Sequence, residues 1–576
     1  MLSTEPSAQP SLGDLAALGD RARLVDELCT RYRTQPASAL TLLAELSRML
    51  GFLPEAVIAY VAARLDRSAP ELSALAKAHE LTSLTGEAAI DAEQHRLAVC
   101  GAGPCAARGG SEVERILAEK NLPFEPVGCQ GACDLGPIAC YNRGAPLPIS
   151  AARARSLAKV SPGEWEDVLS VEKPVHAFKT DVMVAFANIF AKGSHQLATA
   201  KRHGVYAPLE AALQQPPEKI YQALLKSGLV GLDGKEVAPQ FDAVRRASGE
   251  KVLVIDALEG ESGLFKDRII LERDPHLLLA GAVMAAYAIG ATEIFLVVRR
   301  EYELALERTR AAVEEALRSG YLGDKVKDSP LSVKMYVRLS AALRSGDRPG
   351  ILAALEGTLS RKDPAAGLYG KPTLVTDVET LSLLPAIVEK GAEWFRGLGV
   401  DGAHGVKLFS LSGDVKRPGN YELQRGTPLR TLIDAHGGGP LQGKTITAAL
   451  IGGAGGGLIP PAHFDVPLDE AALKRDGATL GNGAVVLATE KTCLVDLVRR
   501  EAIFAARDSI GVGQQGAVEL KAIAEAAPET AEAQLAALSA RGVARPLIAS
   551  LNEGFKDAVR EHREGLCTCS PKRARR

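Results

Sequence analysis

The sequence predicts a multidomain α/β protein, and three observations lead to this class. The chain has 576 residues, which at roughly 150 residues per domain allows about four domains. Apolar residues recur with the spacing of amphipathic helices near both ends of the chain. Between these ends, buried strand candidates alternate with helical segments, which is the pattern of β-α-β units. We therefore expect several cores rather than one.

Charge and composition exclude several classes of protein. The 68 basic and 70 acidic residues give a formal net charge of -2, so we expect neither nucleic acid nor an anionic membrane as a main partner. Nine cysteines in the whole chain are too few for a disulfide scaffold. The polar N-terminus lacks the basic start and apolar run of a secretory signal. These features predict a cytoplasmic protein.

The longest apolar stretch covers residues 277–298, and Gly290, Thr292 and Glu293 interrupt it. This pattern favours a helix to about residue 289 and a buried strand over 294–298 rather than a membrane span. We therefore expect no direct membrane insertion.

The first half of the chain divides into three predicted segments. Leu43, Leu46 and Leu50 have the spacing of one helix face, and the same periodicity predicts a helical bundle over residues 12–90. A short strand before Cys100 begins a small domain over residues 91–150. Proline-rich and basic stretches then favour a linker and helical lead-in over residues 151–203.

The second half begins with a β-α-β core over residues 204–400, with strand candidates at 251–256, 293–298 and 332–337. Short strands with Gly and Pro turns predict a β-rich domain over residues 401–490. Its Gly-rich segment 452–457 is interpreted as a tight turn. The helical pattern returns over residues 491–565, and a short basic tail covers residues 566–576.

Five of the nine cysteines lie between Cys100 and Cys140. Four of them form two pairs, Cys100-x4-Cys105 and Cys129-x3-Cys133, with 23 residues between the pairs. Four thiolates on two short loops can enclose a soft metal centre. Zinc sites favour shorter C-x2-C pairs, so the spacing favours a [2Fe–2S] cluster, with zinc or unliganded redox thiols as alternatives. Cys140 is interpreted as a buried structural thiol.

The helical start followed by this motif resembles the thioredoxin-like [2Fe–2S] subunit that accompanies the flavoprotein subunit of respiratory complex I. NAD-linked hydrogenases and formate dehydrogenases carry relatives of it. The resemblance implies that Cys100, Cys105, Cys129 and Cys133 are the cluster ligands. The gap of 23 residues is shorter than the family usually has, which implies a trimmed hairpin.

From about residue 204 to 555 the chain resembles the NADH-binding flavoprotein subunit of complex I. The matching stretches are 259–268, 274–276, 285–290, 367–373, 378–380, 391–395 and 412–421. The resemblance implies a Rossmann-like α/β flavoprotein core over residues 204–400. It also implies a β-grasp domain over residues 401–490 and a C-terminal helical bundle that holds a [4Fe–4S] cluster in the relatives.

Four elements of the family's flavin pocket differ in this sequence. The glycine-dense phosphate loop lets backbone N–H groups approach phosphate oxygens, but residues 230–240 here include Asp233 and Glu236. The family's Asn-x-Asp-Glu stretch becomes Asp-Ala-Leu-Glu at 256–259, and its Asn-Asn pair becomes Thr-Asp at 376–377. The segment with paired glutamates is 339–348, where only Asp347 is a partial substitute.

Together these changes predict that FMN and NAD binding are lost, and no catalytic residue is predicted. If FMN were held in an altered pocket, Glu259, Glu261 and Lys266 would be the residues expected to help hold it.

The [4Fe–4S] cluster of the relatives is expected to be absent. Its cysteine positions are occupied by Ile510, Gly513 and Gly516, and the fourth falls near Ala537. None of these side chains can bind iron. Cys567 and Cys569 lie beyond the match and are interpreted as free surface thiols.

The favoured hypothesis is an electron-transfer and scaffold subunit of a multisubunit redox complex, with one [2Fe–2S] cluster. Its expected partners are the other subunits of a hydrogenase, a formate dehydrogenase or a similar reductase. Two alternatives stay open. One is an active NAD(P)H dehydrogenase subunit with FMN in a remodelled pocket, and the other is a structural subunit whose cysteine site is empty or holds zinc.

Overall fold

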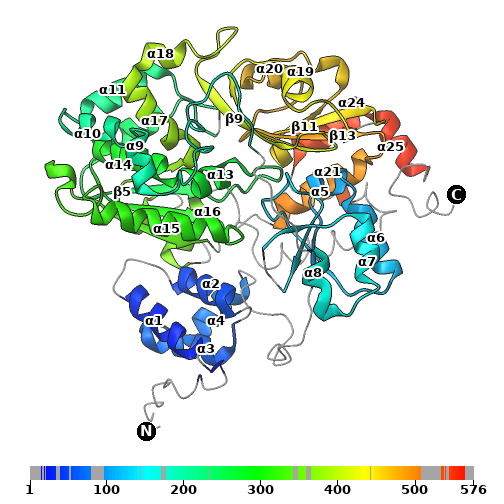
Figure 1. The fold of residues 1–576 in the computed structure, drawn as a ribbon, viewed down its shortest axis with the longest axis horizontal. Coiled ribbons are helices and arrows are strands. Elements are labelled where there is room, and N and C mark those ends of the chain that lie inside the picture. Colours follow the sequence, from blue (N-terminus) through cyan, green and yellow to red (C-terminus); the bar gives the residue numbers. More distant parts are fainter. Residues whose placement is uncertain are drawn as a thin grey trace.

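The computed structural model describes most of the chain in four packing units (Figure 1). Residues outside the description are 1–14, 16–17, 20, 34–38, 51–52, 79–96, 143–144, 170–176, 233, 341–347, 359–362, 364, 442, 508–533, 537–538, 540–543 and 565–576. Within the described part, no helix is both long and apolar enough to cross a bilayer.

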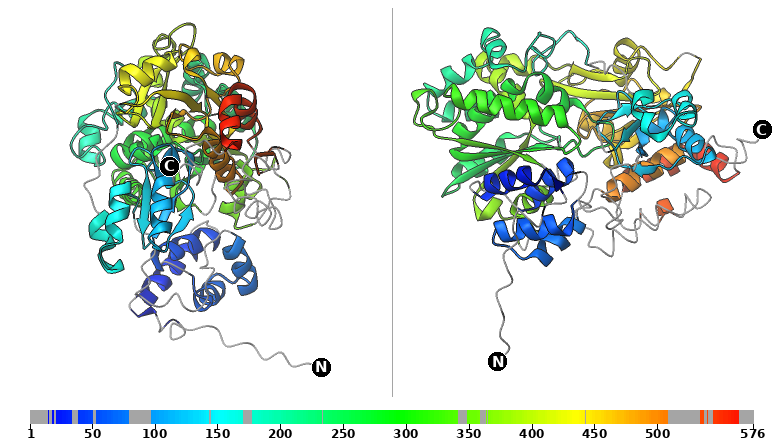
Figure 2. Two further views of the ribbon diagram at one scale, coloured as in Figure 1. Left: turned by 90° about the vertical axis from the view of Figure 1, so that its right-hand side faces the viewer. Right: turned by 60° about the horizontal axis from the view of Figure 1, so that its bottom comes forward.

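The N-terminal unit is a bundle of four helices, as the periodicity predicts: α1 (Arg21–Arg33), α2 (Ala39–Leu50), α3 (Glu55–Arg64) and α4 (Ala69–Ala78). The bundle shares one buried core with a sheet from the middle of the chain. In that core, Leu40 and Leu43 of α2 belong to the same cluster as Val254 and Phe295. The right-hand view of Figure 2 shows these helices directly below the strands.

The second unit is a small four-stranded sheet in the order β2-β1-β3-β4. Its strands are β1 (Leu97–Cys100), β2 (Glu125–Val127), β3 (Ile138–Tyr141) and β4 (Leu147–Pro148). Its helices are α5 (Gly103–Ala107), α6 (Gly110–Glu119), α7 (Ala151–Leu157) and α8 (Trp165–Leu169).

The start of the expected linker over residues 151–203 is part of this second unit. Leu157 of α7 and Trp165 of α8 lie in one core with Leu97 and Val99 of β1. The proline content of this stretch suggested a linker, but its apolar side chains are buried against the sheet.

The third unit is a parallel sheet in the order β7-β6-β5-β8. Its strands are β5 (Lys251–Ala257), β6 (Ala291–Val298), β7 (Lys334–Leu339) and β8 (Thr373–Asp377). Its helices are α9 (Leu197–Arg202), α10 (Ala207–Leu213), α11 (Glu218–Ser227), α12 (Ala238–Arg246), α13 (Lys266–Arg273), α14 (Pro275–Ile289), α15 (Glu303–Arg318), α16 (Arg348–Glu356), α17 (Val378–Lys390) and α18 (Ala392–Arg396).

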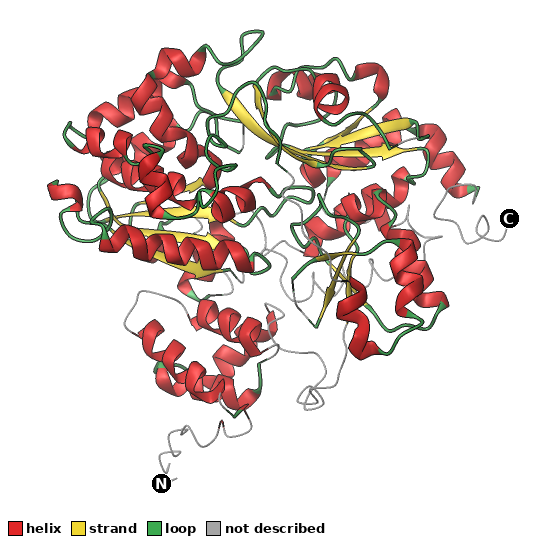
Figure 3. Ribbon diagram, in the orientation of Figure 1, coloured by secondary structure: helices red, strands yellow, loops and turns green. Residues whose placement is uncertain are grey.

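Both faces of this sheet are covered, which explains why its strands are almost continuously apolar. Leu253 and Ile255 belong to the core that contains α14 and α17. Val252 and Val254, which alternate with them, belong to the core that contains the N-terminal bundle. Figure 3 shows helices on both sides of these strands.

The fourth unit contains a mixed five-stranded sheet in the order β10-β9-β13-β11-β12. Its strands are β9 (Val406–Gly413), β10 (Gly419–Gln424), β11 (Ile446–Ile451), β12 (Gly457–Ile459) and β13 (Ala484–Thr489). Its helices, and those that follow, are α19 (Leu429–Thr431), α20 (Glu470–Arg475), α21 (Leu494–Arg507), α24 (Arg545–Gly554) and α25 (Lys556–Arg563).

The short helical turns of the chain are Pro162–Glu164, Val326–Asp328, Leu368–Gly370, Gly453–Gly455, Pro461–His463 and the π-helical Leu432–His436. The turn Gly453–Gly455 joins β11 to β12, as expected for the Gly-rich segment. Ile510, Gly513, Gly516 and Ala537, which the resemblance assigns to the [4Fe–4S] ligand positions of the relatives, lie outside the described residues. So do Asp233, Asp347, Cys567 and Cys569.

Candidate metal centre

The fold brings the four predicted ligands together in one buried site. Cys100 ends β1, Cys105 lies in α5, and Cys129 and Cys133 lie in the loop between β2 and β3. Their exposed fractions are only 1–2%. The Cys129 and Cys133 sulfurs are 3.4 Å apart, and the Cys100 thiol lies within hydrogen-bonding reach of Cys105 and Cys129. The fifth cysteine, Cys140, is buried on β3.

Glycines allow the two cysteine loops to close over the site. Gly131 has a φ of +64°, and its N–H donates to Cys129 Sγ at 3.4 Å. A Cβ atom at Gly131 would lie 2.3 Å from the Tyr302 ring, and one at Gly136 would lie 3.3 Å from Cys105 Sγ. A side chain at Gly131 would therefore clash with Tyr302, and one at Gly136 would crowd the Cys105 sulfur.

The electrostatics favour a thiolate at Cys129. Hydrogen bonds from the Cys100 and Cys133 thiols hold the pKa of Cys129 well below its usual range, and the charge of Arg299 acts in the same direction. The pKa of Cys100 is raised by its hydrogen bonds with Cys105 and Cys129 and by burial, and that of Cys133 by its hydrogen bond with Cys129 and by burial. Thiolates are the form of cysteine that binds metals.

The donor set and its burial fit a binuclear iron–sulfur centre. Such a centre distributes four thiolates over two irons. Four sulfurs with backbone N–H groups nearby are the arrangement that a [2Fe–2S] cluster needs.

Side chains from two other units close the site. Phe265 and Phe504 share one apolar cluster with the four cysteines. Glu501 of α21 is fully buried and accepts a hydrogen bond from the Gly103 N–H at 3.0 Å. Burial raises the pKa of Glu501 to about 8. The Nη2 of Arg268 donates to both carboxylate oxygens of Asp134, each at 3.1 Å.

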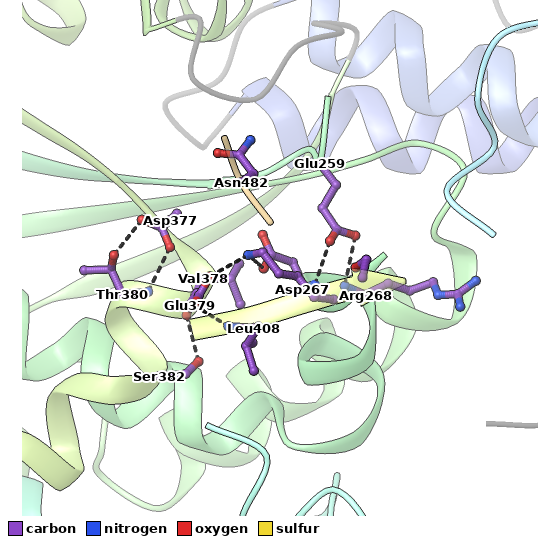
Figure 4. Close-up of polar contacts among 12 residues, drawn as sticks. Glu259, Asp267, Arg268, Asp377, Val378, Glu379, Thr380, Ser382, Leu408 and Asn482 are labelled. Carbon is purple, nitrogen blue, oxygen red and sulfur yellow. Dashed lines mark hydrogen bonds and ion pairs between the residues drawn. The ribbon is translucent and has the colours of Figure 1, made fainter. Parts of the chain in front are cut away.

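The carboxyl edge of the parallel sheet lies beside this site and carries the predicted flavin-holding residues. Figure 4 shows Glu259 directed at the start of α13. Its carboxylate accepts from the N–H groups of Asp267 at 2.8 Å and Arg268 at 3.3 Å, and from the Tyr302 hydroxyl at 2.6 Å. A helix N-terminus can bind an anion such as phosphate, but here the Glu259 carboxylate occupies that position.

Lys266 is completely buried, and its ammonium is neutralised by protein carboxylates. Its Nζ lies 2.8 Å from Asp267 and 3.0 Å from Glu379. Burial lowers the pKa of Lys266, but these carboxylates outweigh that effect and raise it well above the usual range. Glu261 lies further along, where the Asn482 N–H donates to it at 2.9 Å, and burial raises its pKa to about 7.

Two further acids occupy this edge. Asp256 and Asp377 are register partners on β5 and β8, and both are buried. Asp377 caps α17 by accepting from the Thr380 N–H at 2.8 Å (Figure 4), and Asp256 accepts from the Leu258 N–H at 3.0 Å. Among the buried groups of this edge the carboxylates outnumber the lysines, and Arg268 and Arg299 lie beside them. The carboxylates are Asp256, Glu259, Asp267, Asp377 and Glu379, and the buried lysines are Lys266 and Lys407.

Comparison with known proteins identifies each unit. The model of the thioredoxin-like [2Fe-2S] ferredoxin matches residues 25–159, that of the Nuo51 FMN-binding domain matches 224–386, and that of the SLBB domain matches 408–460. The chain is 38% identical over 339 residues to the F 2 subunit of NADH-quinone oxidoreductase of Rhizobium meliloti (strain 1021), covering 57% of this chain and 80% of that protein. The chain belongs to the family of NADH-quinone oxidoreductase F subunits.

Other relatives extend this result. The NADH-quinone oxidoreductase F subunit of Aquifex aeolicus (strain VF5) is 35% identical over 326 residues, covering 55% of this chain and 75% of that one. A solved structure of an NAD+-reducing [NiFe]-hydrogenase in the H2-reduced state superposes with a TM-score of 0.71 and 25% identity, covering 92% of this chain and 93% of that chain. The predicted fold class, with its ferredoxin, flavoprotein-like and β-grasp parts, is confirmed.

The comparisons also refine the organisation of this family member. The ferredoxin match begins at residue 25 and so includes the N-terminal helices, which the periodicity alone predicts as a separate domain. The ligand assignment to the four cysteines and the flavin-holding roles of Glu259, Glu261 and Lys266 stay predictions.

Sequence reasoning missed the residues that contact the cysteine loops from other units, chiefly Arg299, Tyr302 and Glu501. Arg299 and Tyr302 follow β6 at the carboxyl edge of the sheet, where functional groups of parallel sheets gather, so this topological signal could have indicated them. Glu501 carries no such signal, because it lies within an ordinary amphipathic helix.

Proposed function

We propose that this member of the family is an electron-transfer and scaffold subunit of a multisubunit redox complex. In this proposal, Cys100, Cys105, Cys129 and Cys133 hold one [2Fe–2S] cluster, which supplies one-electron transfer when bound. The flavoprotein-like core holds the cysteine loops in position but has lost FMN and NADH binding. The observation that carries the proposal is the contrast between the intact four-thiol site and the acidic carboxyl edge beside it.

The acidic edge does not fit an anionic cofactor. FMN and NADH carry phosphates, which need N–H groups or cations. Of the three residues predicted to hold FMN, only Lys266 is cationic, and two carboxylates already neutralise its ammonium. The start of α13 is occupied by Glu259. Asp256 and Asp377 are the buried acids by which this edge departs from the resemblance, and a phosphate beside them would face their negative charge.

A second candidate is an active NAD(P)H dehydrogenase subunit with FMN in a remodelled pocket. The match of residues 224–386 to the Nuo51 FMN-binding domain favours it. In that case, Glu259, Glu261 and Lys266 would be the residues that help hold FMN.

Cofactor analysis of the anaerobically purified full chain distinguishes the candidate functions. Iron, acid-labile sulfide, zinc and flavin would be quantified, and the absorbance spectrum recorded before and after NADH. Two irons and two sulfides per chain without flavin support the proposal. Stoichiometric FMN that NADH reduces would establish the dehydrogenase, and zinc or no metal would favour a structural subunit.

The partners that we propose are the catalytic and electron-accepting subunits of a hydrogenase, a formate dehydrogenase or a similar reductase in the cytoplasm. The structure that superposes on this chain is that of an NAD+-reducing [NiFe]-hydrogenase, which supports a hydrogenase as the partner. Affinity purification of the tagged chain from its native host, followed by mass spectrometry, should recover such subunits in stoichiometric amounts. Recovery of the chain alone would contradict this assignment.

A further inference from the structure

Arg299 lies where the flavoprotein-like core meets the second cysteine pair. It directly follows β6, and its backbone N–H donates to the Ala257 carbonyl at 3.2 Å. Its side chain is only 11% exposed. The fold therefore places a guanidinium between the carboxyl edge of the sheet and the predicted cluster site.

The guanidinium contacts both the cysteine loop and the segment that follows β5. Its Nη2 donates to the Cys129 carbonyl, and its Nη1 donates to the Glu259 carbonyl at 3.0 Å. Its Nε pairs with Glu301 at 2.9 Å. Because all three nitrogens have partners, the planar group is held in one orientation.

The neighbouring residue Tyr302 keeps the cysteine loop against this guanidinium. The Arg299 guanidinium lies 5.6 Å from the centre of the Tyr302 ring, and the ring packs closely on Gly131. The Arg268–Asp134 pair ties the same loop to α13. The loop therefore cannot move away from Arg299 without breaking these contacts.

The Glu301 carboxylate alone does not cancel the charge of Arg299. Glu301 is shared, since Arg300 also pairs with it, at 3.0 Å. Two guanidinium groups thus face one carboxylate, and Arg299 is the one in contact with the ligand loop. A partly buried charge is poorly screened by solvent, so its effect on a neighbouring centre is large.

We propose that Arg299 is a positioning residue that fixes the Cys129 loop and raises the reduction potential of the [2Fe–2S] centre, an inference that rests on the proposed function. A centre that accepts one electron gains one negative charge. A fixed cation beside it stabilises the reduced form more than the oxidised form. Through Arg299, the flavoprotein-like core thereby increases the electron affinity of the cluster.

Redox titration of the full chain, followed by EPR, tests this proposal. Arg299→Gln removes the charge but keeps a group that can donate to the Cys129 carbonyl. We expect it to shift the reduction equilibrium about tenfold toward the oxidised form, which is about 59 mV for one electron. Arg299→Lys should retain most of the wild-type potential.

Two variants at neighbouring positions serve as matched tests. Arg300→Gln removes the same charge from a side chain that is 38% exposed, so solvent screening should leave a much smaller shift. Glu301→Gln removes the opposing carboxylate and should raise the potential.

Iron and sulfide counts on every variant separate the possible failures. A wild-type chain without iron would overturn the proposed function itself. An iron-loaded Arg299→Gln variant with the wild-type potential would overturn only the role of Arg299. If Arg299→Gln loses its iron, the Glu301→Gln variant provides the test. A raised reduction potential in that variant supports the proposal, and an unchanged potential overturns it.

Discussion

Cys129 is contacted both by residues of its own loop and by Arg299, which lies far from it in the sequence. The cysteine motif alone does not indicate the contact with Arg299. The Cys129 sulfur meets Cys133 and accepts from Gly131, and its carbonyl accepts from Arg299. Hydrogen bonds of this kind orient a metal ligand and tune the metal.

Replacing Cys129 by Ser should therefore abolish the iron–sulfur spectrum. A serine hydroxyl is a poor substitute for a thiolate toward iron, so iron content should fall to near zero, as measured by a ferrozine assay and visible absorbance. Cys140→Ser is the matched control, because Cys140 is also buried on β3 but lies outside the four-cysteine motif. Equal iron in both variants would contradict the ligand assignment.

Asp274 illustrates a buried acid that should make stability depend on pH. It caps α14 by accepting from the Leu277 N–H, and it is fully buried. Burial raises its pKa from 3.8 to about 7. The folded chain therefore holds a proton that the unfolded chain has released, so this contribution to stability is complete below pH 4 and is lost as the pH rises to 7.

The expected slope is about 1.4 kcal/mol per pH unit between these limits. Asp274→Asn keeps a capping oxygen but cannot ionise, so its melting temperature should fall less steeply between pH 4 and pH 7 than that of the wild type. Differential scanning fluorimetry across this range measures the difference. Parallel slopes for the two proteins would show that Asp274 does not titrate in this window.

At the residue scale, local patterns could predict the cysteines but not their surroundings. Two short motifs place the sulfurs, whereas Arg299 lies 170 residues and Glu501 398 residues from the cysteine-loop residues that they contact. Similarly, the acids at 256 and 377 could be identified as departures from a resemblance. That they are register partners follows only from the pairing of β5 with β8.

Helices and strands were easiest to predict where a single hydrophobic periodicity runs through the whole segment. The helices of the N-terminal bundle and the long apolar helix α14 agree with the periodicity. Strand β8 was not expected, because its five residues TLVTD are too short and mixed for a clear pattern. The location of α7 and α8 in the ferredoxin core was hidden by the prolines around them.

A buried ion pair between two helices, α2 and α15, leads to the next prediction. Glu45 of α2 is buried, accepts from the Tyr32 hydroxyl, and forms a bidentate pair with Arg310 of α15 at 2.9 and 3.0 Å. Glu45→Gln would leave Arg310 without its charge partner, which we expect to cost about 3 kcal/mol.

Hydrogen exchange measured by mass spectrometry should then show faster exchange in α1–α4 of the Glu45→Gln variant. The control is Arg48→Gln, which removes an exposed pair between the same two helices, Arg48 with Glu303. An exposed pair contributes under about 1 kcal/mol, so Arg48→Gln should leave exchange almost unchanged. A larger effect for Arg48→Gln would contradict the importance of the buried pair.

On the scale of the whole molecule, the four-cysteine site is shared by three of the packing units. The ferredoxin sheet supplies the cysteines, the parallel-sheet unit supplies Arg268 and Arg299, and α21 supplies Glu501. Arg500 of α21 also donates to the Gly101 carbonyl at 3.0 Å. The ferredoxin part has its own small core, but the walls of its candidate cluster site come from elsewhere.

An isolated fragment of residues 91–169 should therefore bind iron less durably than the full chain. Removing Phe265 and Phe504 exposes the cysteines to water, and the ties of the ligand loops to Arg268, Arg299 and Glu501 are lost. We expect iron to transfer from the fragment to a chelator at least about tenfold faster, equivalent to about 1.4 kcal/mol in the barrier. Reconstituted fragment and full chain would be compared by the decay of visible absorbance. Circular dichroism of the fragment would confirm that its sheet is folded. Equal decay rates for the fragment and the full chain would show that the ferredoxin part is sufficient by itself to protect the cluster.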